Sequence, residues 1–359
     1  KEAIYYPAKD AIFYSADVHG NQITGERLRC ISRIINHSST GEGVLTVVTT
    51  MDGIADRLIP VERFKEAVIT LDYSSEIEPE KLAKKLVAMG FVRTGMVEDK
   101  GQFAIRGGII DIFSYTDEAP VRIELWDTEV DSIRMFDVES QRSIERLQSY
   151  SIFPATEYIF TEDELKNGLY NIKKECDRQL ECFDYGKRKR TKEQIEAGNN
   201  LNKLVADVER TGNYEKFTDT IVADTVGLAE YFPEENTLVV LDEPNRLKEC
   251  NELTLYEYNE SMKNRLAAGY VLPSQTNKVK AMNEIIGDLR NNKKLILTTL
   301  DYKPEGFEID YSMYITARSI SSYNNSFEYL AKDLEKYKKN GYTTILVCSS
   351  RTRALRIVD

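Results

Sequence analysis

Apolar and polar side chains alternate most clearly between residues 101 and 149, and the best-defined run is 121–126. Successive side chains of a strand point to opposite faces, so this run predicts a strand with one core face and one exposed face. The two faces carry different residue types: Val121, Ile123 and Leu125 on the core face, and Arg122, Glu124 and Trp126 on the exposed face.

The exposed face of this strand has two interpretations. A guanidinium, a carboxylate and the only Trp of the chain have the composition of a protein-binding hot spot, in which an aromatic anchor lies beside hydrogen-bond donors. Alternatively, Trp126 packs under a neighbouring loop and the charges form a solvated cross-strand pair. The alternation is equally compatible with both.

The preceding segment, residues 101–113, repeats the alternating pattern. Phe103 and Ile105 share one face, and Ala104 and Arg106 share the other. The glycines at 107 and 108 predict a bulge or sharp bend, after which the strand resumes at 109–113. We therefore expect Arg106 and Arg122 on one sheet face, on neighbouring strands, where they would suit a partner that carries carboxylates.

The remaining pattern of residues 73–160 predicts a small β-rich domain with one helix. The helix spans 79–90, with Leu82, Leu86 and Met89 on one stripe. Further strands are predicted at 132–136 and from 142 onward to Pro154, which ends the block. This domain is expected to interrupt an α/β chain, whose two parts are residues 1–72 and 161–318, and residues 319–359 read as the beginning of a further α/β domain.

The α/β parts show buried-type strands alternating with helical periodicity. A helix capped by Thr24 carries apolar residues from Leu28 to Ile35. Residues 12–14 read as a strand or loop, and 64–71 as a helix or strand. The other predicted strands are 3–6, 44–49, 238–241, 293–300, 311–316 and 342–348, and the other predicted helices are 52–58, 163–185, 195–208, 246–266, 279–289, 326–339 and one beginning at 352.

Composition narrows the functional classes. The chain has 359 residues with 42% hydrophobic and 30% charged residues, which is typical of a soluble globular protein of two or three domains. A net charge of −11 argues against a protein whose main task is to bind a phosphate backbone. The single basic run, residues 187–190 with Lys192, reads as a solvated helix end or loop in preference to a nucleic-acid contact.

Cysteine and histidine usage predicts neither a zinc site nor a catalytic triad. Five scattered Cys without a CxxC pair fit a reducing cytosol, and the chain has only two His. No apolar run is long enough to span a membrane, and no signal peptide is present, so we expect a cytoplasmic protein. Because the chain begins without Met and ends in a helix-like pattern, we expect it to be a fragment of a longer protein.

One acidic pair deserves a chemical interpretation. Asp242 and Glu243 follow an apolar strand, where a nucleoside triphosphatase keeps its magnesium-binding acids. The phosphate loop GxxxxGK[ST] is missing from these residues, so we expect no ATP hydrolysis. The preferred interpretation is a relic of a nucleotide-binding sheet that now caps the next helix.

Three sequence blocks resemble one family. They are residues 101–113 (GQFAIRGGIIDIF), 120–143 (PVRIELWDTEVDSIRMFDVESQRS) and 152–157 (IFPATE). All three are similar to the N-terminal UvrB-like module of bacterial transcription-repair coupling factors (Mfd). Weaker similarity lies at 25–28, 241–244 and 323–334. UvrB is a relative of this family. Three features favour the coupling factor over UvrB: the phosphate loop is missing, residues 106–109 read RGGI, and the segment 5–29 is too short for a tyrosine-rich hairpin that grips DNA. The family's module has a longer N-terminal segment, so an upstream phosphate loop would escape this comparison.

The resemblance implies a degenerate helicase-like (P-loop-type, RecA-like) α/β domain interrupted by a UvrA-binding domain. It implies that Arg106, Arg122 and Trp126 contact UvrA, with Glu124 beside them and Arg134 and Arg142 as secondary candidates; the family often has Phe where this chain has Trp126. The implied function is a non-catalytic, monomeric adaptor that recruits nucleotide excision repair to stalled RNA polymerase. No cofactor is expected in these residues, since ATP, magnesium, DNA and RNA polymerase would engage other domains, which would also mask the UvrA surface. The alternative is a fragment of a UvrB-type ATP-dependent damage-verification enzyme.

Overall fold

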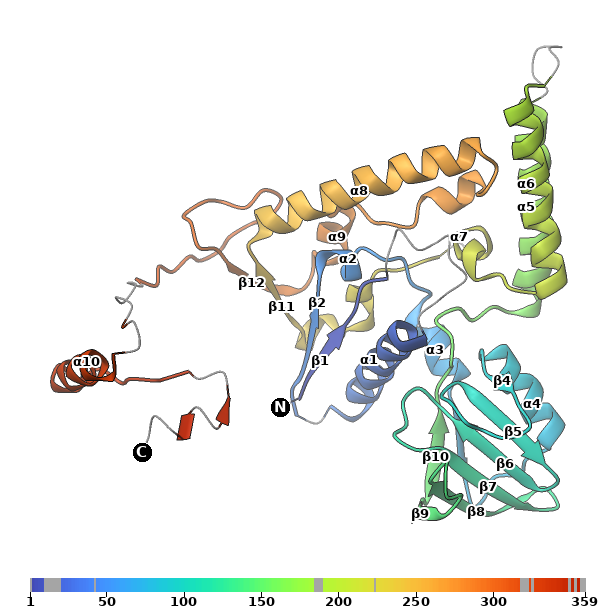
Figure 1. Cartoon of the computed structure of the whole chain (residues 1–359), viewed down its shortest axis with the longest axis horizontal. Coiled ribbons are helices and arrows are strands. Elements are labelled where there is room, and N and C mark those ends of the chain that lie inside the picture. The colour runs from blue at the N-terminus through green and yellow to red at the C-terminus, as the bar shows by residue number, and fades with distance from the viewer. Residues whose placement is uncertain are drawn as a thin grey trace. The chain divides into compact units, whose positions relative to one another are not determined.

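The computed structural model describes residues 2–9, 21–41, 43–183, 190–222, 224–316 and 326–347, together with positions 323, 350, 351, 354 and 355. The chain divides into two compact units, Lys1–Phe307 and Glu308–Asp359. All strands of the described residues lie in the first unit, whereas the second contains helix α10 (Phe327–Lys339), close to the predicted helix 326–339 (Figure 1). The fold is mixed α/β with several sheets, as the sequence predicts.

The largest sheet has six strands in the order β4-β5-β6-β7-β8-β9. Neighbouring strands are antiparallel except for the parallel pair β4–β5. Beside this sheet, β3 (Ile69–Asp72) pairs antiparallel with β10 (Ser149–Ile152). The six strands are β4 (Val92–Arg93), β5 (Gln102–Arg106), β6 (Ile109–Phe113), β7 (Val121–Trp126), β8 (Glu129–Phe136) and β9 (Ser143–Arg146).

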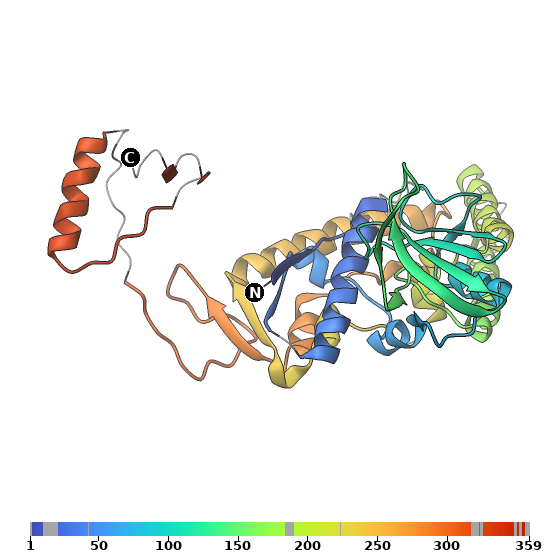
Figure 2. The ribbon, with the colours of Figure 1, turned by 90° about the horizontal axis from the view of Figure 1, so that it is seen from below.

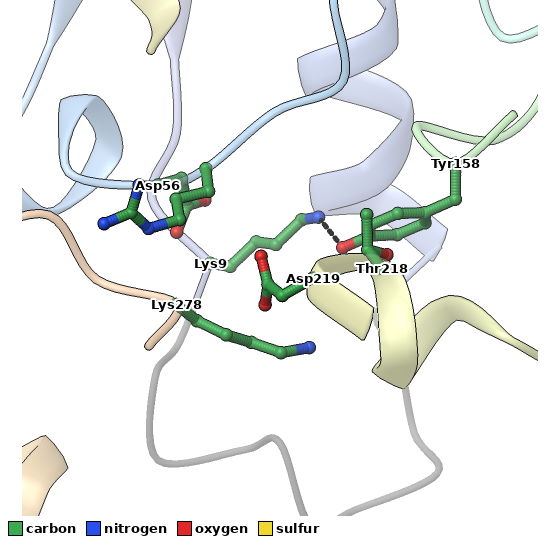
Figure 3. Close-up of a pocket in the computed structure, with 7 residues that line it drawn as sticks. Lys9, Asp56, Tyr158, Thr218, Asp219 and Lys278 are labelled. Carbon is green, nitrogen blue, oxygen red and sulfur yellow. Dashed lines mark hydrogen bonds between the residues drawn. The ribbon is translucent and has the colours of Figure 1, made fainter. Parts of the chain in front are cut away.

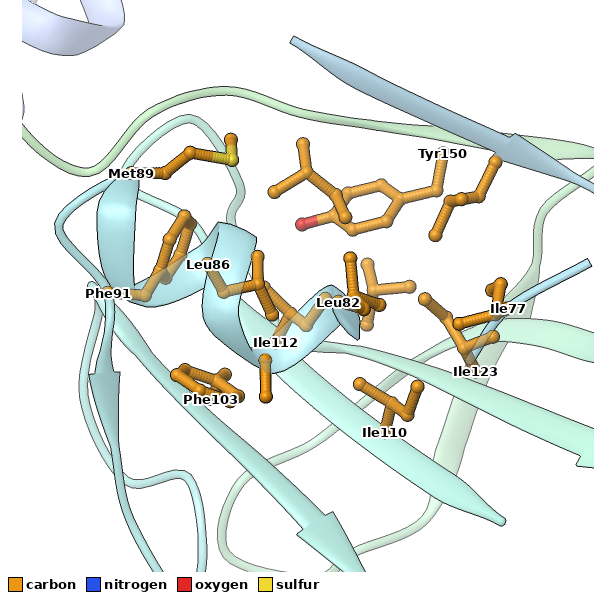
Figure 4. Packing of buried hydrophobic residues seen from close by; sticks show 14 of the residues in the cluster. Ile77, Leu82, Leu86, Met89, Phe91, Phe103, Ile110, Ile112, Ile123 and Tyr150 are labelled. Carbon is orange, nitrogen blue, oxygen red and sulfur yellow. The ribbon is translucent and has the colours of Figure 1, made fainter. Parts of the chain in front are cut away.

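One face of this sheet is packed against helix α4 (Pro79–Ala88), as Figure 4 shows. Leu82 and Leu86 project from the helix onto Phe103 and Ile123 of the sheet, and all four are buried. The helix begins with Pro79 at its first turn, where the missing N–H leaves no intrahelical bond unmade. The predicted apolar stripe of 79–90 and the predicted core face of β7 are therefore both confirmed.

The two adjacent glycines form a hairpin turn. Of the predicted bulge or sharp bend the chain therefore takes the bend, and the residues on either side of it form two strands and not one resumed strand. Arg106 pairs with Ile109, so the chain reverses at Gly107 and Gly108 and β6 runs antiparallel to β5. Gly107 has φ +62°, and a Cβ on Gly108 would lie 2.9 Å from the Leu125 carbonyl oxygen. Both positions thus favour glycine. As a result β6 separates β5 from β7, so the predicted direct neighbourhood of the Arg106 and Arg122 strands is wrong.

The N-terminal α/β part contains a parallel strand pair joined by a helix. β1 (Glu2–Tyr6) and β2 (Leu45–Thr49) flank α1 (Asn21–Thr40), whose apolar stripe packs on them (Figure 2). Because α1 begins at Asn21, Thr24 lies inside the helix and the predicted cap is wrong. Residues 12–14 lie outside the described part. After β2 come α2 (Met51–Ile54), which is shorter than predicted, and α3 (Val61–Ala67), which precedes β3.

A second parallel pair follows the inserted sheet. β11 (Leu238–Asp242) pairs with β12 (Lys293–Leu297), and the connection contains α8 (Pro244–Ala267) and α9 (Met282–Asp288). The strands predicted at 311–316 and 342–347 are wrong, because the chain there forms no strand in the described structure. Cys348 and the start of the helix predicted from 352 lie outside the described residues, whereas 354 and 355 are helical.

Between the inserted sheet and β11, two long helices pack side by side (Figure 1). They are α5 (Glu162–Phe183) and α6 (Lys192–Thr211), and α6 begins with a capping box formed by Thr191 and Gln194. Most of the basic run, residues 187–189, lies outside the described part. The remaining short elements are η2 (Glu215–Phe217), α7 (Thr218–Ile221), η3 (Leu228–Tyr231), η4 (Glu234–Asn236) and η5 (Pro273–Thr276).

The two parallel pairs bury only one of their faces well. The inward residues join cores with α1 or with α8 and α9. On the outward faces, Tyr5, Val48, Leu238 and Val240 are between 52% and 59% exposed. None of the helices in the described part is long and apolar enough to cross a membrane.

Candidate partner-binding surface

The face of the six-stranded sheet that points away from α4 carries most of its charges. We call the side chains of Arg106, Asp111, Arg122, Glu124, Trp126 and Arg134 the charged face. Asp111, Arg122 and Arg134 lie opposite one another on β6, β7 and β8. Along β7 the burial alternates as predicted, with Val121 and Ile123 buried and Arg122 and Glu124 half-buried. The period of two in the sequence therefore placed these residues on the correct face.

Asp111 is the centre of the charged face. Its side chain is 1% exposed, and it accepts two hydrogen bonds from Arg122: Nε to Oδ1 at 2.6 Å and Nη2 to Oδ2 at 2.8 Å. The Arg122 Nη2 also donates to Gln141 Oε1 at 2.8 Å, and the guanidinium lies 4.3 Å from the Phe136 ring centroid. The hydrogen bonds to Asp111 raise the pKa of Arg122, which keeps this side chain charged.

Arg106 shares the same carboxylate. Its Nη2 donates to Asp111 Oδ2 at 2.6 Å, while the side chain stays 44% exposed. Two arginines from β5 and β7 thus converge on one buried acid of β6. They lie on one face, as predicted, although β6 lies between their strands.

A second charge pair lies beside the first. Arg134 forms an ion pair with Glu124, and the Ser132 hydroxyl donates to Glu124 Oε2 at 2.7 Å. These are cross-strand contacts between β7 and β8, of the kind that stabilises antiparallel sheets. Arg142 is exposed and lies between the turn at 137–141 and β9, where its carbonyl accepts a hydrogen bond from the Asp137 amide.

Trp126 ends β7 and is 80% exposed. It precedes the tight turn at Asp127, whose φ is +58°. The cross-strand charge pairs of the second sequence interpretation are present, but Trp126 does not pack under a loop. The hot-spot interpretation stays a prediction. A large exposed aromatic ring on the same strand as an arginine has the composition of an interface anchor.

Sequence reasoning missed Asp111 and Gln141. A usable signal was present for Asp111, because a charged residue interrupts the apolar run 109–113, and such a residue in a buried strand needs a charged partner. Gln141 offers no such signal, since its role depends on how the 137–141 turn folds over β7.

Glu243, the second acid of the pair at the end of β11, has a structural role. It occupies the N-cap position of α8, as the preferred interpretation expects, but its side chain makes no capping hydrogen bond there. Its carboxylate accepts hydrogen bonds from the Thr299 amide at 2.6 Å and from the Thr299 hydroxyl, and these bonds lower the pKa of Glu243. Asp242 is exposed at the end of β11. Within the described ranges no group of three or more His, Cys, Asp or Glu is arranged to hold a metal ion.

A buried charge cluster lies where the inserted sheet returns to the α/β part. Arg27 of α1 is fully buried and pairs with Glu157 at 2.6 Å and with Asp56 at 2.9 Å. Lys9 pairs with Glu157 and donates to the Tyr158 hydroxyl, both at 2.6 Å. Burial alone would raise the pKa of Glu157, but Arg27 and Lys9 together lower it to about 2.

The cavity beside this cluster is small. Figure 3 shows Lys9, Tyr158, Asp219 and Lys278 around it, and its free volume is about 20 Å³. That volume holds about one water molecule. Because the cluster joins α1, the segment after β1 and the segment after β10, we interpret it as a structural joint and not as a substrate site.

Comparison with known proteins bears on the sheet that carries the charged face. Residues 69–158, which include all six strands, match the family model of the UvrB interaction domain. The transcription-repair-coupling factor of Bacillus subtilis is 30% identical over 367 residues, which cover 99% of this chain and 30% of the relative. The transcription-repair-coupling factor of Staphylococcus epidermidis is 27% identical over 356 residues, covering 99% of this chain and 29% of the relative.

Nearly the whole chain is thus similar to the transcription-repair-coupling factors. This finding confirms the resemblance that the three sequence blocks indicate and supports an N-terminal module of this family. The chain spans about 30% of the length of these curated relatives. The charged face lies entirely within the part that matches the UvrB interaction domain, which makes it the leading candidate site.

Proposed function

We propose that the chain is a non-catalytic adaptor module of a transcription-repair-coupling factor, which binds UvrA through the charged face. By this contact it would recruit nucleotide excision repair to stalled RNA polymerase. The observation that carries the proposal is the 80% exposed Trp126 on the same strand as Arg122 of the Arg106–Asp111–Arg122 cluster, within the UvrB interaction domain match.

The geometry assigns different roles to the two arginines. Arg106 is 44% exposed and has only Nη2 bonded to Asp111, so it can form a charge-assisted hydrogen bond with an acidic partner. Arg122 is 12% exposed, and its Nε and Nη2 are both engaged within the sheet. It therefore contributes mainly positive charge and rigidity, whereas Trp126 contributes the apolar area that is removed from water on binding.

For the α/β part we propose a degenerate, helicase-like sheet without catalytic function. Two parallel strand pairs with helices in their connections are the units from which such sheets are built. The acid after β11 that would be expected to serve magnesium, Glu243, is bonded to Thr299 instead. In this proposal ATP, magnesium, DNA and RNA polymerase engage other domains of the intact protein, and the module acts as a monomer.

A calorimetric titration of the chain with purified UvrA tests the proposal. We expect Trp126→Ala to weaken binding about tenfold or more, since truncating a central aromatic anchor removes most of its contact area. The matched control is Tyr256→Ala, which removes a 68% exposed aromatic side chain from α8, outside the UvrB interaction domain match. We expect this control to bind like the wild type.

Equal affinity of wild type, Trp126→Ala and Arg106→Ala would exclude the charged face as the UvrA site. A thermal shift with magnesium and ATP separates the proposal from the UvrB-type enzyme. Stabilisation by the nucleotide would favour the enzyme, and its absence agrees with an adaptor.

A further inference from the structure

We infer that Asp111 is a positioning residue that fixes Arg106 and Arg122 in advance for an acidic partner. This inference rests on the UvrA-binding function proposed above and adds to it a residue that cannot itself touch the partner. The side chain of Asp111 is 1% exposed, so its effect on binding has to pass through the two arginines.

The bonding pattern of Asp111 supports this role. Its Oδ1 accepts from Arg122 Nε, and its Oδ2 accepts from both Arg122 Nη2 and Arg106 Nη2. Without the carboxylate, two guanidinium groups that share one oxygen would face each other as like charges and separate. With the carboxylate, both are held and the site keeps one net positive charge for the partner.

The contacts of Gln141 provide independent evidence that the Arg122 side chain is fixed in one conformation. Its backbone adopts φ +57°, a left-handed conformation that residues other than glycine rarely adopt. In this conformation its Oε1 accepts from Arg122 Nη2 and its Nε2 donates to the Val138 carbonyl at 2.7 Å. Together with the Phe136 ring on the guanidinium, these contacts leave Arg122 little rotamer freedom.

Fixing the two arginine side chains in advance lowers the entropic cost of binding. Long charged side chains lose rotamer entropy when a partner orders them, and prior ordering removes that cost. The structure thus predicts that loss of the Asp111 charge weakens binding even though it makes the module more positive. A simple electrostatic effect on an acidic partner would have the opposite sign.

The first test compares Asp111→Asn with Asp99→Asn in calorimetric titrations with UvrA. Asp99 is exposed before the start of β5, so its replacement changes the net charge equally without touching either arginine. We expect Asp111→Asn to weaken binding about fivefold, and Asp99→Asn to leave it unchanged or slightly tighter. In a chain that already carries Arg106→Ala and Arg122→Ala, Asp111→Asn should cause no further loss.

The second test needs no UvrA. In NMR spectra of arginine-labelled chain, the Arg122 Nε–H proton should exchange slowly with water in the wild type and rapidly in Asp111→Ala, which removes both acceptor oxygens. Gln141→Gly removes the other acceptor while suiting the positive φ, and should leave this proton protected but loosen the rest of the guanidinium. This variant keeps the test decisive if Asp111→Ala lowers the folded fraction.

The outcomes separate the inference from the function on which it rests. Unchanged protection of the Arg122 Nε–H in Asp111→Ala would overturn the positioning role. Lost protection with wild-type affinity for UvrA would overturn its link to binding. If the wild type itself does not bind UvrA, the proposed function fails, whereas the NMR comparison still decides whether Asp111 fixes the arginines.

Discussion

Two kinds of exposed sheet face occur in this chain, and they differ in chemistry. The six-stranded sheet shows solvent a face of paired charges around the buried Asp111, with one exposed ring, Trp126. The two parallel pairs, β1–β2 and β11–β12, show apolar side chains such as Val48 and Val240. Both faces are accessible, but only the first is internally hydrogen-bonded.

The difference between the two sheet faces shows that an exposed face has to be judged by its chemistry. A charged face whose polar groups already satisfy one another is stable in water and can meet a partner reversibly. Parallel strands normally have both faces covered, and a two-stranded sheet is marginal by itself. We therefore expect the six-stranded sheet to be the stable region of the chain and the parallel pairs to be its labile region.

The largest effect should come from the core under the charged face. Phe103 is fully buried against α4, so Phe103→Ala should lower the free energy of unfolding by about 3–5 kcal/mol through lost burial and a residual cavity. Denaturant unfolding followed by circular dichroism measures this change. The comparison variant Leu241→Ala, in the core behind β11, should cost less, about 2–3 kcal/mol, because it removes fewer atoms and because that strand pair relaxes more easily. Equal losses of unfolding free energy in the two variants would contradict the proposed difference in rigidity between the six-stranded sheet and the parallel pairs.

The next largest effect on stability should come from the buried charge cluster around Glu157 that joins the two regions, and this effect should depend on pH. The folded pKa of Glu157, about 2, lies below its ordinary value of 4.5, so its stabilisation is complete above about pH 5. That stabilisation, roughly 3 kcal/mol, should be lost as the pH falls from 4.5 towards 2. Glu157→Gln should therefore be less stable than the wild type at pH 7, and the difference should shrink in acid.

Thermal unfolding of both chains between pH 7 and pH 3 measures this difference. Comparison with the variant is needed because burial raises the pKa of Asp56, which makes that residue oppose Glu157 in the raw pH profile. A difference between wild type and variant that stays constant across this range would contradict the assigned role of Glu157.

Local pattern was sufficient to predict the elements that build the site. The alternation in 121–126 gave the faces of β7, and the stripe of 79–90 gave the helix that covers the core. The same kind of pattern failed at 311–316 and 342–347, because apolar segments form strands only where a neighbouring strand supplies hydrogen bonds. The domain boundaries at 72, 160 and 318 remain predictions.

Contacts between distant residues could not be predicted in this way. The hairpin at Gly107 placed β6 between the two arginine strands, and only this topology brings both arginines to Asp111. Likewise, Arg27 and Glu157 are separated by 130 positions, so neither position indicates a buried pair by itself. Register and chain reversal, and not residue type, decide such contacts.

The smallest effect on stability should come from the outward apolar faces, and it provides the sharpest comparison of the two regions. Val48→Thr and Val240→Thr keep the β-branched shape at half-exposed positions, so each should change the free energy of unfolding by no more than about 0.5 kcal/mol. Ile123→Thr, at a fully buried position of β7, should instead cost about 2 kcal/mol or more, because it buries a hydroxyl. If the outward faces are truly uncovered in solution, the two valine variants should also bind less of a hydrophobic dye and associate less at high concentration. A loss as large as that of Ile123→Thr would show that the parallel pairs are covered in solution, and the contrast between the two kinds of sheet face would not hold.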